Sequence, residues 1–130
     1  MKKFPFDTQK GIILCKAKLS NRKQSLFIKL VVDTGASFTM IPVETAQALG
    51  IDPFKSTLPP LEISTANGIV LAPLIKIPLF TCFGVTYKNI EIICHNLPQE
   101  SCAEGLLGLN FLKKTKIIID FSESIIKIPY

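Results

Sequence analysis

The sequence lacks several features that would assign it to a common protein class. No apolar run reaches the ~18 residues that a membrane-spanning helix needs. The apolar piece near the N-terminus, residues 11–15, is too short for the core of a signal peptide. The 130 residues contain no internal repeat, low-complexity segment or obvious linker, and that length suits one domain. We therefore expect a single domain over residues 1–130, no membrane partner and a cytoplasmic location.

Metal-ligating residues are also scarce. The single histidine, His95, follows Cys94 directly, and no two of the four cysteines have C-x-x-C spacing. We expect neither a metal nor a cofactor, and interpret the cysteines as small apolar residues in a reducing compartment. A disulfide in an exported protein is the alternative.

Acidic residues are few in the first part of the chain. Residues 1–29 contain eight Lys or Arg against one acid, Asp7, within a net charge of +5. This asymmetry raises nucleic acid as a possible partner. However, the lysines alternate with apolar residues in LCKAKLS and LFIKLVV, as in strands with one solvated face, and few aromatic residues lie among them to stack on bases. We expect no nucleic-acid partner; binding that weakens steeply as salt rises would contradict this.

What the sequence does contain is a series of short β-like segments. Forty-eight per cent of the residues are hydrophobic, and nine Pro and seven Gly separate the apolar runs. The dipeptide Asn67-Gly68, between two such runs, is the strongest hairpin signal. The fold class is therefore all-β, with strands expected over residues 11–20, 24–32, 38–41, 79–83, 89–95, 116–120 and 124–130.

Two short helices are expected among these strands. PVETAQALG, residues 42–50, begins with Pro42, has Glu44 in its first turn and ends at Gly50. LNFLKKT, residues 109–115, follows the loop 96–105. Both helices are short, so the β segments dominate the fold.

An unusual carboxylate ends the apolar run in LVVDTGASFTMIP, residues 30–42. An ionised group in such surroundings is costly to bury unless it is paired or used. Gly35 allows a sharp turn and a close approach of substrate, and the Thr34 hydroxyl can hold the loop rigid. Asp33 is therefore the candidate general base. A turn capped by Asp33 is the simpler alternative.

Cleavage of an amide also requires a proton donor to the carbonyl oxygen. Two carboxyls that share one proton meet both needs, and the aspartic-protease dyad is the worked example of such a coupled pair. Asp33 is the one aspartate of four that lies in Asp-Thr-Gly. If it is half of a dyad, the other half must come from a second copy of the chain across a two-fold axis.

At this point the sequence resembles the retropepsin-like aspartic proteases, in particular their bacterial and cellular branch. The resemblance rests on LVVDTGASFTMIP as catalytic loop, STANGIVLAP as flap hairpin and GLLGLNFLKKTKIIIDF as the hydrophobic-hydrophobic-Gly motif with its helix and strand. These stretches occur in the family's order over roughly residues 11–129. The resemblance implies an acid-protease barrel with a flap hairpin, active as a homodimer on polypeptide substrates.

The resemblance also implies a role for each matching residue. Asp33 of each protomer would activate water and protonate the scissile carbonyl, Thr34 would brace the partner's loop, and the Gly35 carbonyl would bind the substrate main chain. The substrate would further contact Ala36, a mobile flap and the motif under the loop. The flap residues are Thr65, Ala66, Asn67, Gly68 and Ile69, and the motif residues are Leu106, Leu107 and Gly108.

Departures from the retroviral pattern accompany this match. Retroviral members pair an aspartate four residues after the catalytic one with an arginine directly after the motif glycine, and here these positions are Ser37 and Leu109. Both partners are absent together, and Asn110 keeps a polar residue where the bacterial branch often has Asp. The terminal SIIKIPY either interleaves with a second protomer or forms a strand of its own subunit.

Two other readings stay open. The chain can be a non-catalytic peptide-binding or dimerisation module on the same fold, although retention of Asp33, Thr34 and Gly35 argues against lost activity. It can also be a protease domain derived from a longer precursor.

Overall fold

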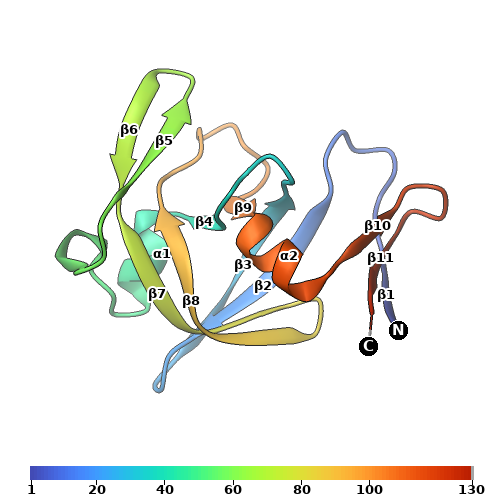
Figure 1. The fold of residues 1–130 in the computed structure, drawn as a ribbon, viewed down its shortest axis with the longest axis horizontal. Coiled ribbons are helices and arrows are strands. Elements are labelled where there is room, and N and C mark those ends of the chain that lie inside the picture. Colours follow the sequence, from blue (N-terminus) through green and yellow to red (C-terminus); the bar gives the residue numbers. More distant parts are fainter. Residues whose placement is uncertain (130) are drawn as a thin grey trace.

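The computed structural model describes residues 1–129 and shows the expected all-β architecture; Tyr130, the last residue of the expected domain and terminal strand, lies outside the described residues. Short helices and a 3-10 turn interrupt the strands (Figure 1). The strands are β1 Lys2–Pro5, β2 Leu14–Ser20, β3 Ser25–Val32, β4 Met40–Ile41, β5 Leu61–Thr65, β6 Gly68–Ala72, β7 Leu74–Cys82, β8 Val85–Cys94, β9 Gly105–Leu107, β10 Ile118–Asp120 and β11 Ile125–Ile128; the helices are α1 Val43–Ala48, η1 Pro53–Lys55 and α2 Leu109–Thr115.

The centre of the molecule is a closed barrel in the order β2-β3-β9-β4-β8-β7. Strands β2 and β3 form an antiparallel hairpin, and β3 pairs in parallel with β9, which aligns Val32 with Leu107. Along β2, Ala17 and Leu19 are buried while the intervening Lys16 and Lys18 are exposed. This alternation follows from the two-residue period of a strand whose inner face packs in the core.

The barrel core is filled by aliphatic side chains and closed by an aromatic cluster. Phe111 of α2 is fully buried and contacts Phe80 and Tyr87, at ring-centroid distances of 5.5 Å and 5.4 Å. The Tyr87 hydroxyl shares a 3.0 Å hydrogen bond with the hydroxyl of Thr115 at the end of α2. Helix α2 therefore covers one opening of the barrel, next to the end of β3 (Figure 1).

Both helices occur where the sequence predicts them. Helix α1 begins directly after Pro42, and Gly50, with φ of +77°, lies just past its end. Helix α2 ends at Lys116, which adopts left-handed backbone angles (φ 56°, ψ 41°). Because Lys116 closes the helix in this way, the strand expected over 116–120 begins only at Ile118.

Strands β7 and β8 are longer than the sequence predicts. The sequence predicts separate short strands over 79–83 and 89–95, whereas the structure has strands of nine and ten residues. They are joined by the two-residue turn Phe83-Gly84, in which both residues have positive φ, 51° and 73°. Such a turn matches the twist of the flanking strands and so forms a tight hairpin.

The two chain ends form a sheet of their own. Strand β11 lies in the middle of the order β1-β11-β10, paired antiparallel with both neighbours. Lys2 lies opposite Ile128, so the described ends are adjacent, on the side of the molecule away from β5 and β6 (Figure 1). The segment 125–128 is thus a central strand of its own subunit, and β1 is an element that the sequence analysis does not predict.

Candidate active site

The Asp33 loop is a tight turn at the end of β3. The Asp33 N–H donates to the Leu107 carbonyl oxygen (3.0 Å), which continues the pairing of β3 with β9. The Gly35 N–H donates to Asp33 Oδ1 (2.8 Å), and the Ala36 N–H donates to the Asp33 carbonyl oxygen (3.2 Å). The carboxylate is half-buried, whereas Thr34 and Gly35 are exposed. The turn therefore presents an oriented carboxylate at the surface of the protomer.

The start of α2 fixes the far side of this loop. The Leu109 N–H donates to the Ala36 carbonyl oxygen (2.8 Å), and the Asn110 N–H donates to that of Ser37 (3.2 Å). In the retroviral pattern an ion pair links these two segments; here Ser37 and Leu109 occupy its positions, and backbone hydrogen bonds make the link. The loop is consequently rigid without buried charge, as a preorganised site requires.

A buried polar pair adds a second link, and the sequence analysis assigns it no such role. Thr39 is fully buried, and both its N–H and its hydroxyl donate to Asn110 Oδ1, at 2.8 Å and 2.9 Å. The Thr39 hydroxyl oxygen accepts from the Gly108 N–H (3.1 Å), and Asn110 Nδ2 donates to the Glu91 carbonyl oxygen (2.7 Å). The one available signal is a lone Thr inside the apolar stretch SFTMIP.

Two glycines are required because backbones approach closely here. A Cβ on Gly108 would lie 2.4 Å from the carbonyl carbon and oxygen of Phe38, and one on Gly105 would lie 2.0 Å from the Met40 carbonyl oxygen. Neither contact can be relieved by turning a side chain. The glycine of the Leu106-Leu107-Gly108 motif therefore lets β9 and α2 pack directly against the segment that follows the Asp33 loop.

The other two motif residues face different surroundings. Leu106 is half-buried and packs on a small apolar cluster that includes Met40 and Ile93. Leu107 is fully buried in the main core. The side chain of Leu106 is thus partly accessible, whereas that of Leu107 is inaccessible and packs beneath the Asp33 loop.

The flap is the hairpin of β5 and β6. Its turn differs by one position from the expected Asn67-Gly68, because Thr65 pairs with Gly68 and the loop residues are Ala66 and Asn67. Gly68 has φ of +114°, while the loop residues keep negative φ, as in a turn followed by a glycine bulge. The Thr65 hydroxyl donates to the Gly68 carbonyl oxygen (2.8 Å) and closes the tip.

The flap is anchored at its base and exposed at its tip. Leu61 and Ile63 pack on the same small apolar cluster as Leu106, so this cluster links the base of the hairpin to β9. Ile69 and Leu71 of β6 are 70% and 65% exposed. The structure thus joins Asp33 through Ala36 to Leu106 through Gly108 by hydrogen bonds and packing, and connects the flap to them through its base.

The remaining aspartates are each occupied in local turns. Asp7 accepts from the Gln9 N–H (2.9 Å), and Asp52 caps η1 by accepting from the Phe54 N–H (3.0 Å). Asp120 accepts from Ser122 and forms a 3.0 Å ion pair with Lys127 in the terminal sheet. Within residues 1–129, none of these three carboxylates forms a hydrogen bond with Asp33.

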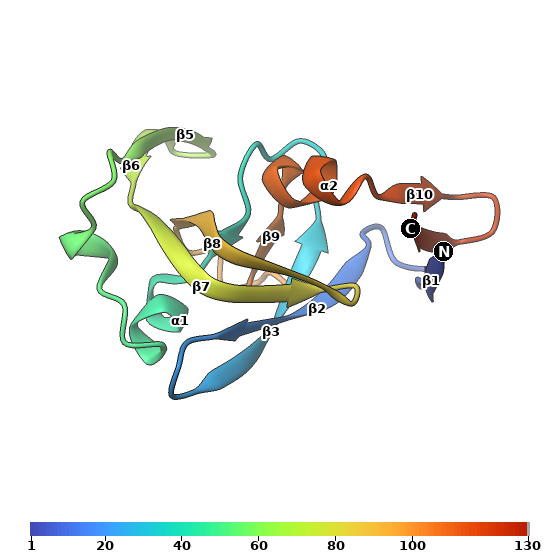
Figure 2. The ribbon, with the colours of Figure 1, turned by 60° about the horizontal axis from the view of Figure 1, so that its bottom comes forward.

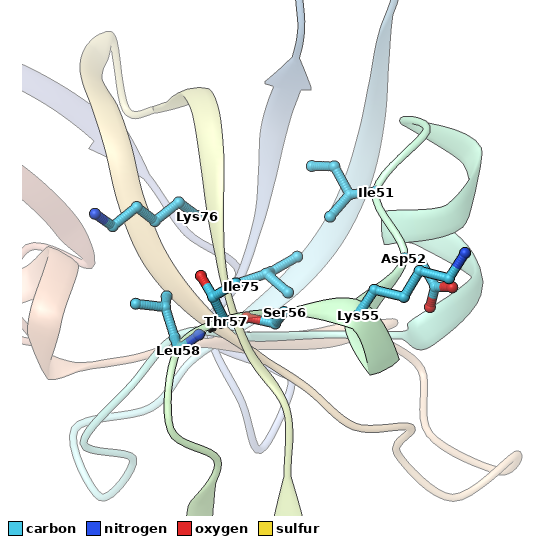
Figure 3. Close-up of a pocket in the computed structure, with 8 residues that line it drawn as sticks. All are labelled: Ile51, Asp52, Lys55, Ser56, Thr57, Leu58, Ile75 and Lys76. Atoms are coloured by element: carbon cyan, nitrogen blue, oxygen red, sulfur yellow. Dashed lines mark hydrogen bonds between the residues drawn. The ribbon is translucent and has the colours of Figure 1, made fainter.

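Two hollows lie on the surface of the molecule. One, of about 330 Å³, lies between η1 and β7 under the flap base and contains no predicted site residue (Figure 3). The other, of about 350 Å³, borders the Asp33 loop through Thr34. The second hollow is lined on its other sides by α2 and the start of the terminal sheet, namely Leu109, Leu112, Lys113, Lys116, Ile117 and Ile119.

Among residues 1–129, no three His, Cys, Asp or Glu side chains gather closely enough to hold a metal ion. Within the same residues, every helix is too short or too polar to cross a bilayer.

Comparisons with known proteins agree with this geometry. A family model described as "gag-polyprotein putative aspartyl protease" matches residues 21–114. Among solved structures, the chain is similar to a retropepsin-like aspartic protease from Rickettsia conorii, with 29% identity over 95% of this chain and 86% of that one and a TM-score of 0.71. No curated protein matches the chain. The family match leaves out β1, β10 and β11, which form the terminal sheet, and also the barrel strand β2.

Proposed function

This chain belongs to the retropepsin-like aspartic proteases of the gag-polyprotein type, and from that premise we propose that it is a homodimeric endopeptidase with one Asp33 from each protomer in its catalytic dyad. The observation that carries the proposal is the isolated Asp33 carboxylate, held at the protomer surface by the Gly35 N–H. Asp7, Asp52 and Asp120 accept hydrogen bonds in other turns, and none of these aspartates is followed by Thr-Gly. The second carboxyl therefore has to come from another copy of the chain.

The chemistry follows from two like charges held close together. Two carboxyls a few ångströms apart cannot both ionise easily, so they share one proton. The charged Asp33 removes a proton from water, which attacks the scissile carbonyl carbon, while the protonated Asp33 of the other protomer donates its proton to the carbonyl oxygen. The Gly35 N–H orients one oxygen of each carboxylate during this exchange.

Thr34 is the proposed contact across the two-fold axis. It is exposed at the tip of the loop and borders the hollow between α2 and β10. The exposed hydroxyl would bond the partner's loop, and the apolar lining of the hollow, including Leu109 and Ile117, would receive a partner side chain. Both features lie beside Asp33, as a symmetric dyad requires.

An extended polypeptide is the proposed substrate. It would bind as an added strand between the flap and the Asp33 loop, with main-chain hydrogen bonds supplying affinity. Ile69 at the flap tip and Leu106 on the floor give this cleft an apolar lining. Closure of the flap would exclude water from the dyad. The proposed contact residues are Gly35, Ala36, Thr65, Ala66, Asn67, Gly68, Ile69 and Leu106, supported from beneath by Leu107 and Gly108.

We also propose that residues 1–130 act as one protease domain in the cytoplasm. The shared hydrophobic core and the similarity over 95% of the chain support the domain assignment. The cytoplasmic location rests on the cysteine pattern of the sequence.

The test compares wild type with Asp33→Asn on a broad peptide mixture from about pH 4 to 7.5, over a range of protein concentrations. Because Asn cannot act as acid or base, we expect at least about a hundredfold loss of cleavage, and wild-type specific activity should rise with concentration. Asp7→Asn is the matched control, since it changes an exposed aspartate outside the site. Equal activity of wild type and Asp33→Asn would refute the assignment, and a wild type that binds peptides without cleaving them would indicate a non-catalytic module.

A further inference from the structure

The outer face of the β2–β3 hairpin carries a basic patch, defined here as Lys16, Lys18, Phe27 and Lys29. All four side chains are exposed, and Phe27 is 61% exposed although it is large and apolar. The alternation of β2 and β3 places Ala17, Leu19, Ile28 and Leu30 in the core. The basic patch is therefore a continuous solvent-facing part of the barrel.

The strand register concentrates positive charge within the basic patch. Lys16 lies directly opposite Lys29, and Lys18 lies directly opposite Phe27. Like charges at facing positions of an antiparallel pair destabilise the sheet. Within residues 1–129, none of these lysines has a carboxylate within ion-pair distance of its ammonium. The Glu104 carboxylate accepts from the Lys29 backbone N–H (3.5 Å), and the Glu104 N–H donates to the Lys29 carbonyl oxygen (2.8 Å). The fold thus keeps a charge repulsion that a bound anion would relieve.

Basic residues extend the patch in both directions. At one end, the turn that joins β2 to β3 contains Arg22 and Lys23, both exposed. At the other end, the Lys2 ammonium lies close to Gly84 in the β7–β8 turn. Its Nζ is 3.0 Å from the position that a Cβ on Gly84 would occupy. On β8, Lys88 lies opposite Leu79 on the neighbouring strand. The result is a stripe of cations along the hairpin rather than an isolated pair.

We propose that the basic patch binds the backbone of a single-stranded nucleic acid. Lys16 and Lys18 lie two residues apart, about 6.6 Å along the strand, so their ammonium groups can contact the phosphates of neighbouring nucleotides on one strand. Phe27 offers a ring on which a base can stack, as in sequence-tolerant single-strand binding sites. An acidic protein would satisfy the lysines but would leave Phe27 unused, so nucleic acid fits the basic patch better.

Lys16 and Phe27 already interact in the absence of a ligand. The Lys16 Nζ lies 5.7 Å from the centre of the Phe27 ring. This contact places the cation over one face of the ring, so a phosphate bound by Lys16 would lie next to a base stacked on the other face. The sequence analysis expects no nucleic acid because few aromatics accompany the lysines. The structure shows that the one aromatic residue exposed there lies at the centre of the charge.

The location of the basic patch leaves the cleft accessible. In Figure 2 the β2–β3 hairpin lies at the bottom of the molecule, whereas β5 and α2 lie at the top. Nucleic acid bound to the outer face of the barrel would therefore not cover Asp33 or the flap. Binding would tether the protease near nucleic-acid-associated polypeptides.

The test measures anisotropy of a fluorescein-labelled 20-nucleotide oligo-U or oligo-dT at salt concentrations from about 20 to 200 mM. The variants are a triple substitution Lys16→Gln, Lys18→Gln and Lys29→Gln, and the single substitution Phe27→Ala. The matched control removes the same charge elsewhere, with Lys10→Gln, Lys55→Gln and Lys76→Gln. Circular dichroism and thermal midpoints identify any variant that fails to fold, in which case Phe27→Leu replaces Phe27→Ala.

The triple variant should bind at least about tenfold more weakly at low salt, and its salt slope should fall by about 2, since each lost phosphate contact on a single strand removes about 0.7. Phe27→Ala should weaken binding about tenfold with the slope unchanged, and the control should change affinity less than about twofold. Equal weakening by the control would reduce the effect to net charge and overturn the proposal. If polyglutamate displaced the labelled oligonucleotide as well as unlabelled oligonucleotide does, and Phe27→Ala did not change the affinity, the proposal would be overturned in favour of an acidic protein partner. Absence of saturable binding by wild type would also overturn it.

Discussion

Asn110 shows how a residue without catalytic chemistry can determine the shape of a catalytic loop. Its Oδ1 accepts from the Thr39 N–H, the Thr39 hydroxyl and the Phe111 N–H, and its Nδ2 donates to the Glu91 carbonyl oxygen. These bonds tie together β8, the start of α2 and the segment after Asp33. Because Thr39 is fully buried, water cannot replace the lost partners when Asn110 is removed.

We expect Asn110→Ala to lower the free energy of unfolding by about 2–3 kcal/mol, because it leaves buried donors of Thr39 without an acceptor. Asn110→Asp keeps the acceptor oxygen and loses the donation to Glu91, so it should cost about 1 kcal/mol. Urea denaturation followed by circular dichroism measures both. Equal losses for the two variants would contradict the role assigned to Oδ1.

The cysteines make a second prediction at the scale of the residue. Burial raises the pKa of the Cys94 thiol to about 12. The hydrogen bond with Cys15, followed by burial, raises the pKa of Cys82 as well. Cys102 is exposed. Because the thiolate is the reactive form, Cys94 and Cys82 should not react with an aromatic disulfide reagent at pH 8 unless the protein unfolds, whereas Cys102 should react at once.

Stopped-flow absorbance after mixing with the reagent resolves these thiols by rate. In Cys102→Ser the fast phase should be absent. After unfolding, this variant should react with one equivalent of reagent fewer than unfolded wild type. The half-exposed Cys15 is the other thiol that the reagent can reach in the folded protein. A fast phase that persists when both Cys15 and Cys102 are replaced by Ser, without loss of structure, would contradict the assignment.

At the scale of the element, the β10–β11 hairpin depends on one ionised aspartate. Hydrogen bonds from Ser122, then the ammonium of Lys127, hold the pKa of the Asp120 carboxyl well below its usual range. A carboxyl with a lowered folded-state pKa stabilises the fold above its unfolded pKa of about 3.9, and this contribution is lost as pH falls further toward the folded value. The hairpin should therefore weaken in acid.

We expect Asp120→Asn to be less stable than wild type at pH 7, and the difference should shrink as pH falls below about 4. Thermal midpoints from about pH 2 to 7 test this. Asp7→Asn is the control, because Asp7 lies in a different turn and has no ion pair in the described chain. A stability difference that is constant with pH would show that Asp120 does not act through its charge.

The sequence predicts elements whose signals are local and misses those that depend on distant contacts. Helix α1 has its own start and stop residues, Pro42 and Gly50, and the flap hairpin has its own turn residues. Strand β1 has no comparable signal, because its partner is β11, at the other end of the chain. Likewise, Asp33 is predictable from Asp-Thr-Gly, whereas the Thr39–Asn110 link joins residues 71 positions apart and becomes apparent only in the fold.

At the scale of the whole molecule, the proposed dyad requires two protomers, so a single protomer should be inactive. Asp33→Asn protomers should form mixed dimers with wild type, and each mixed dimer contains one carboxyl where two are required. With a threefold excess of Asp33→Asn, about a quarter of the wild-type protomers retain a wild-type partner, so cleavage should fall to about a quarter.

This measurement requires concentrations at which specific activity has reached its plateau, and time for subunits to exchange. Adding the same excess of Asp7→Asn should instead raise total cleavage. Unchanged wild-type activity in the presence of excess Asp33→Asn would show that one protomer is sufficient and would refute the dyad.

The terminal sheet has a kinetic consequence for such pairs. Strand β11 has β1 on one edge and β10 on the other, both from its own chain, so its edges are complete before any partner arrives. A protomer with this sheet can leave a dimer without unfolding a strand. At low concentration the rate of proteolysis would then follow a second-order law, in which halving the protein lowers the rate about fourfold. The amount of protein synthesised would thus set a concentration below which proteolysis is negligible.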